Sequence, residues 1–236
     1  MKTPIQCSEY FTNQPQWTTG GDDTQYYIEK DESTGEVTVV FAPSNSKTDW
    51  RNNFRFWKKP YKNMDTTFFC HAGFLTCYKK VEDEIRNQVK ALNPTSITIT
   101  GWSYGGAMAV LCMENFWYEF IYLREGQTTD TSDRAKMAVG LPSLRGKIQC
   151  ITFGAPRVVG FWNWRKIKER WEGTRLFKNG SDIVTCVPFV VMLYHHVAKQ
   201  IHIGDKIRLW KYVFAQKYHN VPGEEGYSGT LKKIVE

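Results

Sequence analysis

The stretch from Ser96 to Leu123 constrains the fold more than any other part of the chain. Polar and apolar side chains alternate over residues 96–100, which predicts a short strand. Directly after it comes Gly101-Trp102-Ser103-Tyr104-Gly105, and residues 107–123 are then apolar nearly all round, as in a helix buried on most faces. Glycines at 101 and 105 lack a Cβ, so a strand and a helix can pass closely on either side of a sharp turn at Ser103. The segment predicts an α/β architecture with Ser103 at a strand end.

Other segments continue this alternation of strands and helices. Short strands are expected at 37–41, 148–153 and 175–177. Apolar residues at spacings of three and four predict an amphipathic helix from Leu75 to Leu92, ended by Asn93-Pro94, and a further helix over 161–171. Residues 124–147 are more polar and are expected to form a loop insertion. Together these segments predict a mostly parallel central sheet flanked by helices, with functional groups beyond the carboxyl ends of the strands.

Length and composition fit one globular domain over residues 1–236. Hydrophobic residues make up 42% of the chain and charged residues 23%, which excludes a disordered or fibrous protein. No apolar run approaches the roughly 20 residues that a bilayer requires, which excludes a transmembrane protein. Lysine and arginine outnumber acidic residues by 31 to 24, and the resulting charge of +7 permits an anionic partner.

The cysteines and the N-terminus bear on the compartment. The chain has six cysteines and no CxxC pair, so we expect free, largely buried thiols and no metal site. No apolar stretch follows Lys2, so no secretory signal peptide is recognised. We therefore expect a cytoplasmic protein, with export by a route that needs no signal peptide as the alternative.

Ser103 is the candidate nucleophile. The strand–turn–helix setting exposes its hydroxyl and places it at a helix N-terminus, where backbone N–H groups favour negative charge. The N–H of Tyr104 is then a candidate donor to an oxyanion. The competing interpretation is a glycine-rich helix start with a capping serine.

Five segments in chain order resemble motifs of the class 3, or fungal-type, lipases. They are Val39-Val40-Phe41-Ala42-Pro43-Ser44-Asn45-Ser46 with Asp49-Trp50, His71-Ala72-Gly73-Phe74, Gly101-Trp102-Ser103-Tyr104-Gly105-Gly106-Ala107-Met108-Ala109, Thr152-Phe153-Gly154-Ala155-Pro156-Arg157-Val158 and Asn179-Gly180-Ser181-Asp182-Ile183-Val184. The resemblance implies an α/β-hydrolase fold and hydrolysis of acylglycerol or phospholipid esters without a cofactor. By matching position it makes Ser103 the nucleophile, Asp182 the triad acid and Ser44 the second oxyanion donor.

The catalytic base is expected after Asp182, because α/β-hydrolases carry their triad in the order serine, acid, histidine. This order excludes His71, which we interpret as a buried core histidine. It favours His219, which lies late in the chain before a final helical segment, as the family's base does. The remaining alternatives are His195, His196 and His202.

The chain also departs from the family's pattern. Trp102 and Tyr104 replace the usual His and Leu beside the nucleophile, which concerns the shape of the pocket. Ala42-Pro43 replaces Arg-Gly before Ser44, and proline has no N–H, which concerns the oxyanion loop.

A candidate lid lies at residues 47–62, where the resembled family carries one. The segment mixes basic residues with aromatic ones, namely Trp50, Phe54, Phe56, Trp57 and Tyr61. Such a mixture suits the interface of an anionic membrane. It equally suits a solvated loop whose aromatic rings pack on the domain.

The function expected is that of a serine ester hydrolase acting on lipid acyl esters. The alternative from another class is a lipase-like binding or regulatory module without activity. Nucleic-acid binding is not expected, because the basic residues form no recognised module. The oligomeric state is left open.

Overall fold

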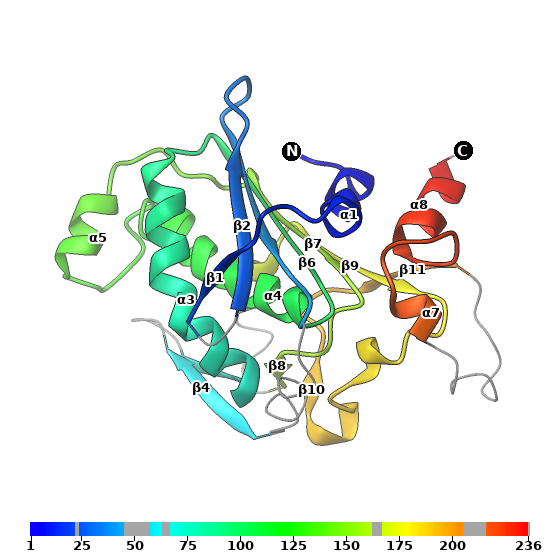
Figure 1. Ribbon diagram of the computed structural model, residues 1–236. Helices are drawn as coiled ribbons and strands as arrows, with labels where there is room; N and C mark the ends of the chain where they lie inside the picture. Colours follow the sequence, from blue (N-terminus) through cyan, green and yellow to red (C-terminus); the bar gives the residue numbers. More distant parts are fainter. Residues whose placement is uncertain (22–23, 45–56, 63–66, 162–166, 205–215, 236) are drawn as a thin grey trace.

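The computed structural model describes residues 1–21, 24–44, 57–62, 67–161, 167–204 and 216–235. Among them the main sheet has seven strands in the order β1-β2-β3-β6-β7-β9-β11 (Figure 1). Strand bounds are Thr18–Gly20 for β1, Thr24–Lys30 for β2, Glu36–Phe41 for β3, Ser96–Trp102 for β6, Ile148–Phe153 for β7, Thr174–Asn179 for β9 and Gln200–Ile203 for β11. From β3 to β11 neighbouring strands are parallel, whereas β1 and β2 are antiparallel additions at one edge.

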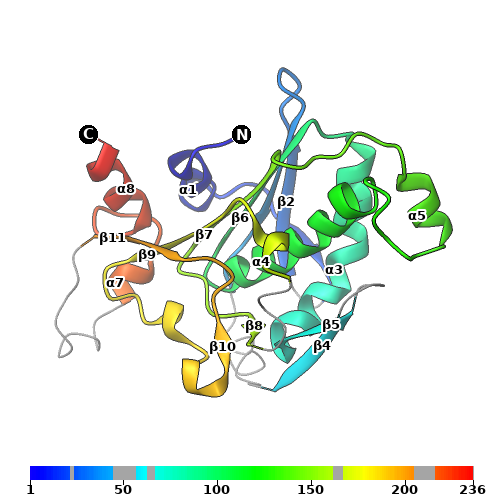
Figure 2. The ribbon, with the colours of Figure 1, turned by 180° about the vertical axis from the view of Figure 1, so that it is seen from behind.

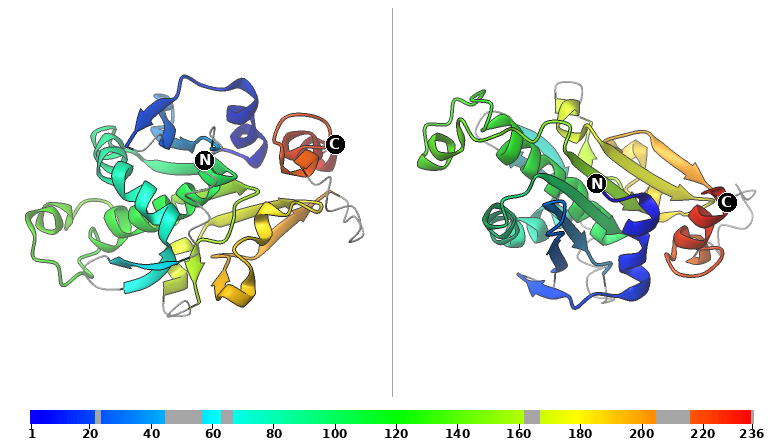
Figure 3. Two further views of the ribbon diagram at one scale, coloured as in Figure 1. Left: turned by 60° about the horizontal axis from the view of Figure 1, so that its bottom comes forward. Right: turned by 90° about the horizontal axis from the view of Figure 1, so that it is seen from above.

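Helices cover both faces of this sheet (Figures 2 and 3). The α-helices among the described residues are α1 Pro4–Asn13, α3 Ala72–Ala91, α4 Tyr104–Trp117, α5 Asp133–Ala138, α7 Gln216–His219 and α8 Tyr227–Val235. Helix α4 continues as a π-helical turn at Tyr118–Tyr122, and short 3-10 helices lie at Lys168–Trp171, Val184–Cys186 and Val190–Met192. Helices α3 and α4 enclose the larger core on one face, while α1 and α8 enclose a smaller core on the other.

A second, antiparallel sheet lies below the main one in Figure 1, in the order β10-β8-β5-β4. Its strands are Lys58–Lys62 for β4, Thr67–His71 for β5, Val159–Gly160 for β8 and Tyr194–His195 for β10. In this sheet β5 leads directly into α3, and the His71 side chain accepts the Phe74 N–H at the start of that helix. The sequence patterns did not predict this sheet, because its strands are short and two of them have only two residues.

Most of the predicted elements agree with the structure. The strands expected at 37–41, 96–100, 148–153 and 175–177 are β3, β6, β7 and β9, and the helix expected over 75–92 is α3. Residues 124–147 are mainly irregular but include α5, which the polar composition concealed. The helix expected over 161–171 is wrong at its C-terminal end, where Lys168–Trp171 is a 3-10 turn, and residues 162–166 lie outside the described residues.

A buried ion pair joins α4 to the turn at Lys168–Trp171. The Arg170 guanidinium lies 2.5 Å from the Glu114 carboxylate, and both side chains are buried. Burial raises the pKa of Glu114, and Arg170 opposes that shift. Removing one partner of such a pair leaves a buried charge uncompensated, so the pair fixes how α4 meets this turn.

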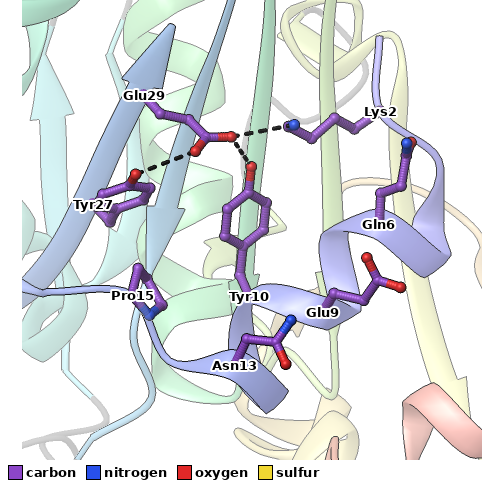
Figure 4. A pocket seen from close by; sticks show the side chains of 8 residues that line it. All are labelled: Lys2, Gln6, Glu9, Tyr10, Asn13, Pro15, Tyr27 and Glu29. Carbon is purple, nitrogen blue, oxygen red and sulfur yellow. Dashed lines mark hydrogen bonds and ion pairs between the residues drawn. The ribbon is translucent and has the colours of Figure 1, made fainter. Parts of the chain in front are cut away.

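Helix α1 docks on β2 through polar contacts around Glu29. Figure 4 shows Lys2, Tyr10 and Tyr27 converging on its carboxylate. Lys2 Nζ is 3.2 Å from Glu29 Oε1, the Tyr27 hydroxyl donates to Oε2 at 3.2 Å, and the Tyr10 hydroxyl donates to Oε1. The carboxylate of Glu29 in the pocket between helix and strand is therefore already paired.

The six cysteines are free, as expected, and four of them are buried. No helix among the described residues is both long enough and apolar enough to cross a bilayer.

Candidate active site

Ser103 occupies a sharp turn between β6 and α4. Its backbone has φ 55° and ψ −121°, a positive-φ conformation outside the αL region that non-glycine residues seldom adopt. The Ser103 N–H donates to the Phe153 carbonyl at 2.9 Å, which ties the turn to the end of β7. The side chain is 5% exposed and stands at the N-terminus of a helix whose dipole favours negative charge.

The glycines around Ser103 are required by close backbone contacts. A Cβ at Gly101 would lie 2.1 Å from the Gly105 carbonyl oxygen, and a Cβ at Gly105 would lie 2.2 Å from that of Phe41. A Cβ at Gly106 would meet the Ala155 Cβ at 2.7 Å. These distances agree with the steric reason for the glycine spacing. Because the glycines lack a Cβ, the start of α4 can pack directly against the end of β3.

Asp182 follows β9 and is fully buried. Its Oδ2 lies 2.9 Å from His219 Nδ1 and accepts the Tyr227 hydroxyl at 2.6 Å, while Oδ1 accepts the Val184 N–H at 2.9 Å. Burial and the Asp182 charge raise the pKa of Tyr227 well above its usual range, so the hydroxyl keeps its proton. A buried carboxylate with these partners fixes the orientation of the His219 ring.

Gly154 brings the Asp182–His219 pair next to Ser103. It follows Phe153, whose carbonyl binds the Ser103 N–H, and its φ is +61°. A Cβ here would lie 2.6 Å from Asp182 Oδ2 and 2.9 Å from His219 Nδ1. The ends of β6, β7 and β9 therefore supply adjoining parts of one site.

The other histidines lie in different surroundings. His71 is 1% exposed, and burial lowers its pKa to about 4, in line with its interpretation as a core histidine. His196 binds the Thr185 carbonyl through Nε2 at 2.8 Å, and burial lowers its pKa to about 4. His195 lies in β10 and His202 on β11. His219, by contrast, makes the described hydrogen bond with the Asp182 carboxylate.

The remaining predicted site residues lie around this centre or outside the described part. Tyr104 opens α4, and its hydroxyl lies 3.2 Å from Thr24 Oγ1. Ser44 is half-buried just beyond the end of β3, and its role as an oxyanion donor stays a prediction. Trp57 is 75% exposed, whereas Trp50, Phe54 and Phe56 of the candidate lid fall outside the described residues.

Comparison with known proteins places this arrangement in a family. The family model described as Lipase (class 3) matches residues 38–192, which contain the motifs and the elements that carry Ser103 and Asp182. The chain belongs to the class 3 lipase family. This confirms the resemblance stated from the sequence motifs.

The curated relatives of this class 3 lipase chain align with part of its sequence. The lipase of Rhizomucor miehei is 31% identical over 100 residues, which are 41% of this chain and 27% of that protein. A chloroplastic phospholipase A(1), DAD1, of Arabidopsis thaliana is 27% identical over 66% of this chain and 34% of its own length. A secreted mono- and diacylglycerol lipase, LIP2, of Malassezia restricta is 26% identical over 70% of this chain and 50% of its own. The chain thus spans half or less of these relatives.

Solved lipase structures share the fold. A fungal lipase–inhibitor complex, reported as a model for interfacial activation, superposes with a TM-score of 0.62 at 22% identity, covering 80% of this chain and 65% of that one. A lipase from Rhizopus microsporus var. chinensis gives 0.57 at 22% identity, covering 86% and 65%. This class 3 lipase chain therefore has the α/β-hydrolase fold.

The sequence motifs did not predict how Gly154 and Tyr227 contribute to the site, nor that the Trp102 indole N–H donates to the His219 carbonyl at 2.6 Å. In the family resemblance Trp102 concerns the shape of the pocket, Gly154 is one position of the fourth segment, and Tyr227 has no role. The glycine directly after a β-strand was the one available signal for Gly154. Tyr227 carried none, since its hydrogen bond joins residues 45 apart.

Proposed function

We propose that this class 3 lipase chain is a serine hydrolase that cleaves acyl esters of acylglycerols or phospholipids through an acyl-enzyme on Ser103. The observation that carries the proposal is the buried Asp182–His219 hydrogen bond of 2.9 Å beside a serine held in a strained turn. Nucleophile, base and orienting acid in this arrangement are the parts that acyl transfer requires.

Each residue has one task in the reaction. His219 takes the Ser103 hydroxyl proton as Oγ bonds to the ester carbonyl carbon, and the N–H of Tyr104 and that of Ser44 bind the developing oxyanion. Collapse of this intermediate releases the alcohol, which leaves with the proton from His219. Water then repeats the sequence on the acyl-enzyme and releases the fatty acid. Asp182 fixes the ring of His219 throughout.

The substrate class rests on the relatives' activities. The Malassezia restricta relative is named for mono- and diacylglycerols, and the Arabidopsis thaliana relative for phospholipids. Both substrate types present an acyl ester at a lipid–water boundary. Ester hydrolysis is the step they share, and the head group remains to be measured.

An exposed apolar surface in the segment that follows Asp182 supports contact with a lipid aggregate. We call it the apolar rim; it consists of Ile183, Phe189, Val190, Val191 and Leu193, with Trp57 and Phe161 beside them. The Phe161 N–H binds the Leu193 carbonyl at 3.0 Å, and the Tyr194 hydroxyl binds the Trp57 carbonyl at 3.1 Å, so these segments adjoin. Apolar groups exposed together favour insertion at a lipid surface.

Lysines next to the apolar rim favour an anionic surface. Lys58 Nζ donates to the Met192 carbonyl at 2.9 Å and lies over the Tyr194 ring, and the neighbouring Lys59 is exposed on β4. Basic side chains beside an apolar surface add attraction to anionic head groups.

Labelling with a fluorophosphonate tests the nucleophile. We expect one covalent adduct on Ser103, none in Ser103→Ala, and hydrolysis of p-nitrophenyl butyrate by the wild type alone. Profiling monoacyl, diacyl, triacyl and phospholipid substrates then assigns the head group. An unlabelled wild type with no ester turnover contradicts the proposal and favours the inactive binding module.

Vesicle sedimentation tests the apolar rim. We expect more protein bound to vesicles containing phosphatidylglycerol than to phosphatidylcholine alone, and less bound after Val191→Glu. Met137→Glu on α5 is the matched control, because Met137 is 77% exposed and Val191 86%. Equal binding by the two variants contradicts the role of the rim, and equal binding to both vesicle types contradicts the role of the lysines.

A further inference from the structure

The indole of Trp102 contacts the main chain of the residue that carries the candidate base. Trp102 Nε1–H donates to the His219 carbonyl at 2.6 Å, although the two residues are 117 apart in sequence. Their ring centroids are 5.8 Å apart. This is a direct bond between the residue before the nucleophile and the segment that holds the base.

That segment needs partners for its carbonyl groups. Helix α7 ends at His219 after four residues, and the last carbonyls of a helix have no partner within it. Trp102 supplies a donor to the carbonyl of His219, and Asn179 Nδ2 supplies donors to those of Tyr218 at 3.2 Å and Glu225 at 2.7 Å. Two side chains at the ends of β6 and β9 thus fasten the segment to the sheet.

Trp102 is itself held in place. Its ring meets Phe11 of α1 edge-on, with centroids 6.3 Å apart and planes at 68°. Phe11 also packs on Phe153, whose carbonyl binds the Ser103 N–H. The N-terminal helix therefore packs against the indole that donates to the His219 carbonyl.

We propose that Trp102 is a positioning residue for the base, acting through the backbone of His219 and supported by Phe11. The inference rests on the proposed function of Ser103 and His219. The imidazole must meet both Asp182 and the Ser103 hydroxyl, and the indole bond fixes the main chain from which it projects. Without that bond the ring samples positions in which one of the two contacts is broken. Misplacement of a catalytic group by about 1 Å costs on the order of 100-fold in rate.

The test is Trp102→Phe, which keeps an aromatic ring against Phe11 and removes the indole N–H. Trp171→Phe is the matched control, because Trp171 Nε1 donates to the Val110 carbonyl at 2.8 Å in the core away from Ser103. We expect kcat on p-nitrophenyl butyrate to fall about 10- to 100-fold in Trp102→Phe. We expect KM to stay unchanged, and Trp171→Phe to keep the wild-type kcat.

Two further readouts distinguish positioning from general support of the fold. In Trp102→Phe the acid limb of the pH profile of kcat/KM should move to lower pH, because a looser Asp182 contact stabilises the imidazolium less. Amide hydrogen exchange should quicken over residues 218–228 in Trp102→Phe and stay unchanged there in Trp171→Phe. Exchange is independent of turnover, so it tests the bond even if the wild type hydrolyses no ester.

Equal kcat in wild type and Trp102→Phe, with unchanged exchange over 218–228, overturns the inference and leaves the proposed function standing. Loss of kcat to the same degree in both tryptophan variants also overturns it, since the effect would then come from stability alone. A wild type that fails to label at Ser103 refutes the proposed function instead.

Discussion

Replacing Gly154 by alanine should separate Asp182 from His219 without removing either side chain. The added Cβ would lie 2.6 Å from Asp182 Oδ2, whereas ordinary contacts begin at 3.4 Å, so the oxygen must retreat by up to the difference of 0.8 Å. The same Cβ would lie 2.9 Å from His219 Nδ1 and push the ring in another direction. A hydrogen bond of 2.9 Å stretched by this amount loses most of its strength.

The expected loss of activity follows from this displacement. A misplacement of about 1 Å costs on the order of 100-fold, so we expect kcat on p-nitrophenyl butyrate to fall about 100-fold in Gly154→Ala. The substitution also places a Cβ at φ +61°, which costs about 1 kcal/mol of stability. Urea denaturation measures that second effect separately from turnover.

Gly146→Ala is the matched control. Gly146 has φ +73°, and a Cβ there would meet nothing within 4 Å. This variant carries the same backbone cost without steric pressure on the site. Equal kcat in the two variants, after similar losses of stability, would refute the argument that Gly154 keeps the pair together.

Three other perturbations address the site and the core. Tyr227→Phe removes a donor from Asp182, so the carboxylate should stabilise the imidazolium more, and the acid limb of the kcat/KM profile should move to higher pH. Burial lowers the pKa of His71 from 6.5 to about 4, so below pH 6.5 the unfolded chain binds a proton that the folded chain does not. Lowering the pH from 7 to 4.5 should therefore lower the free energy of unfolding by about 2 kcal/mol. His71→Asn keeps a side-chain acceptor for the helix cap and cannot titrate. Between pH 7 and 4.5 its free energy of unfolding, measured by denaturation, should therefore fall by about 2 kcal/mol less than that of the wild type. Arg170→Met deprives Glu114 of its ion-pair partner and should lower stability by about 3–5 kcal/mol, and adding Glu114→Gln should recover much of it in the same assay.

Local patterns predicted the parts of the fold that local forces control. The central parallel strands, α3 and the turn at Ser103 were all predictable, because alternation, helical spacing and glycine placement act over a few residues. The antiparallel sheet of β4, β5, β8 and β10 was not, since it pairs short segments from distant parts of the chain. Helix α5 escaped prediction because its six residues lie in a polar stretch.

The sequence by itself determined that Ser103 lies at a strand–helix turn and that an acid and a histidine are available after it. Only the tertiary structure decided which histidine meets Asp182, because the choice among His195, His196, His202 and His219 depends on how the C-terminal segment packs. The same is true of Trp102, whose indole reaches the His219 carbonyl across 117 residues. Such contacts join residues that are far apart in the chain. The spacing of residues within one motif carries no information about them. Trp102 departs from the family's motif, and its hydrogen bond to the His219 carbonyl is the contact that the tertiary structure adds to that observation.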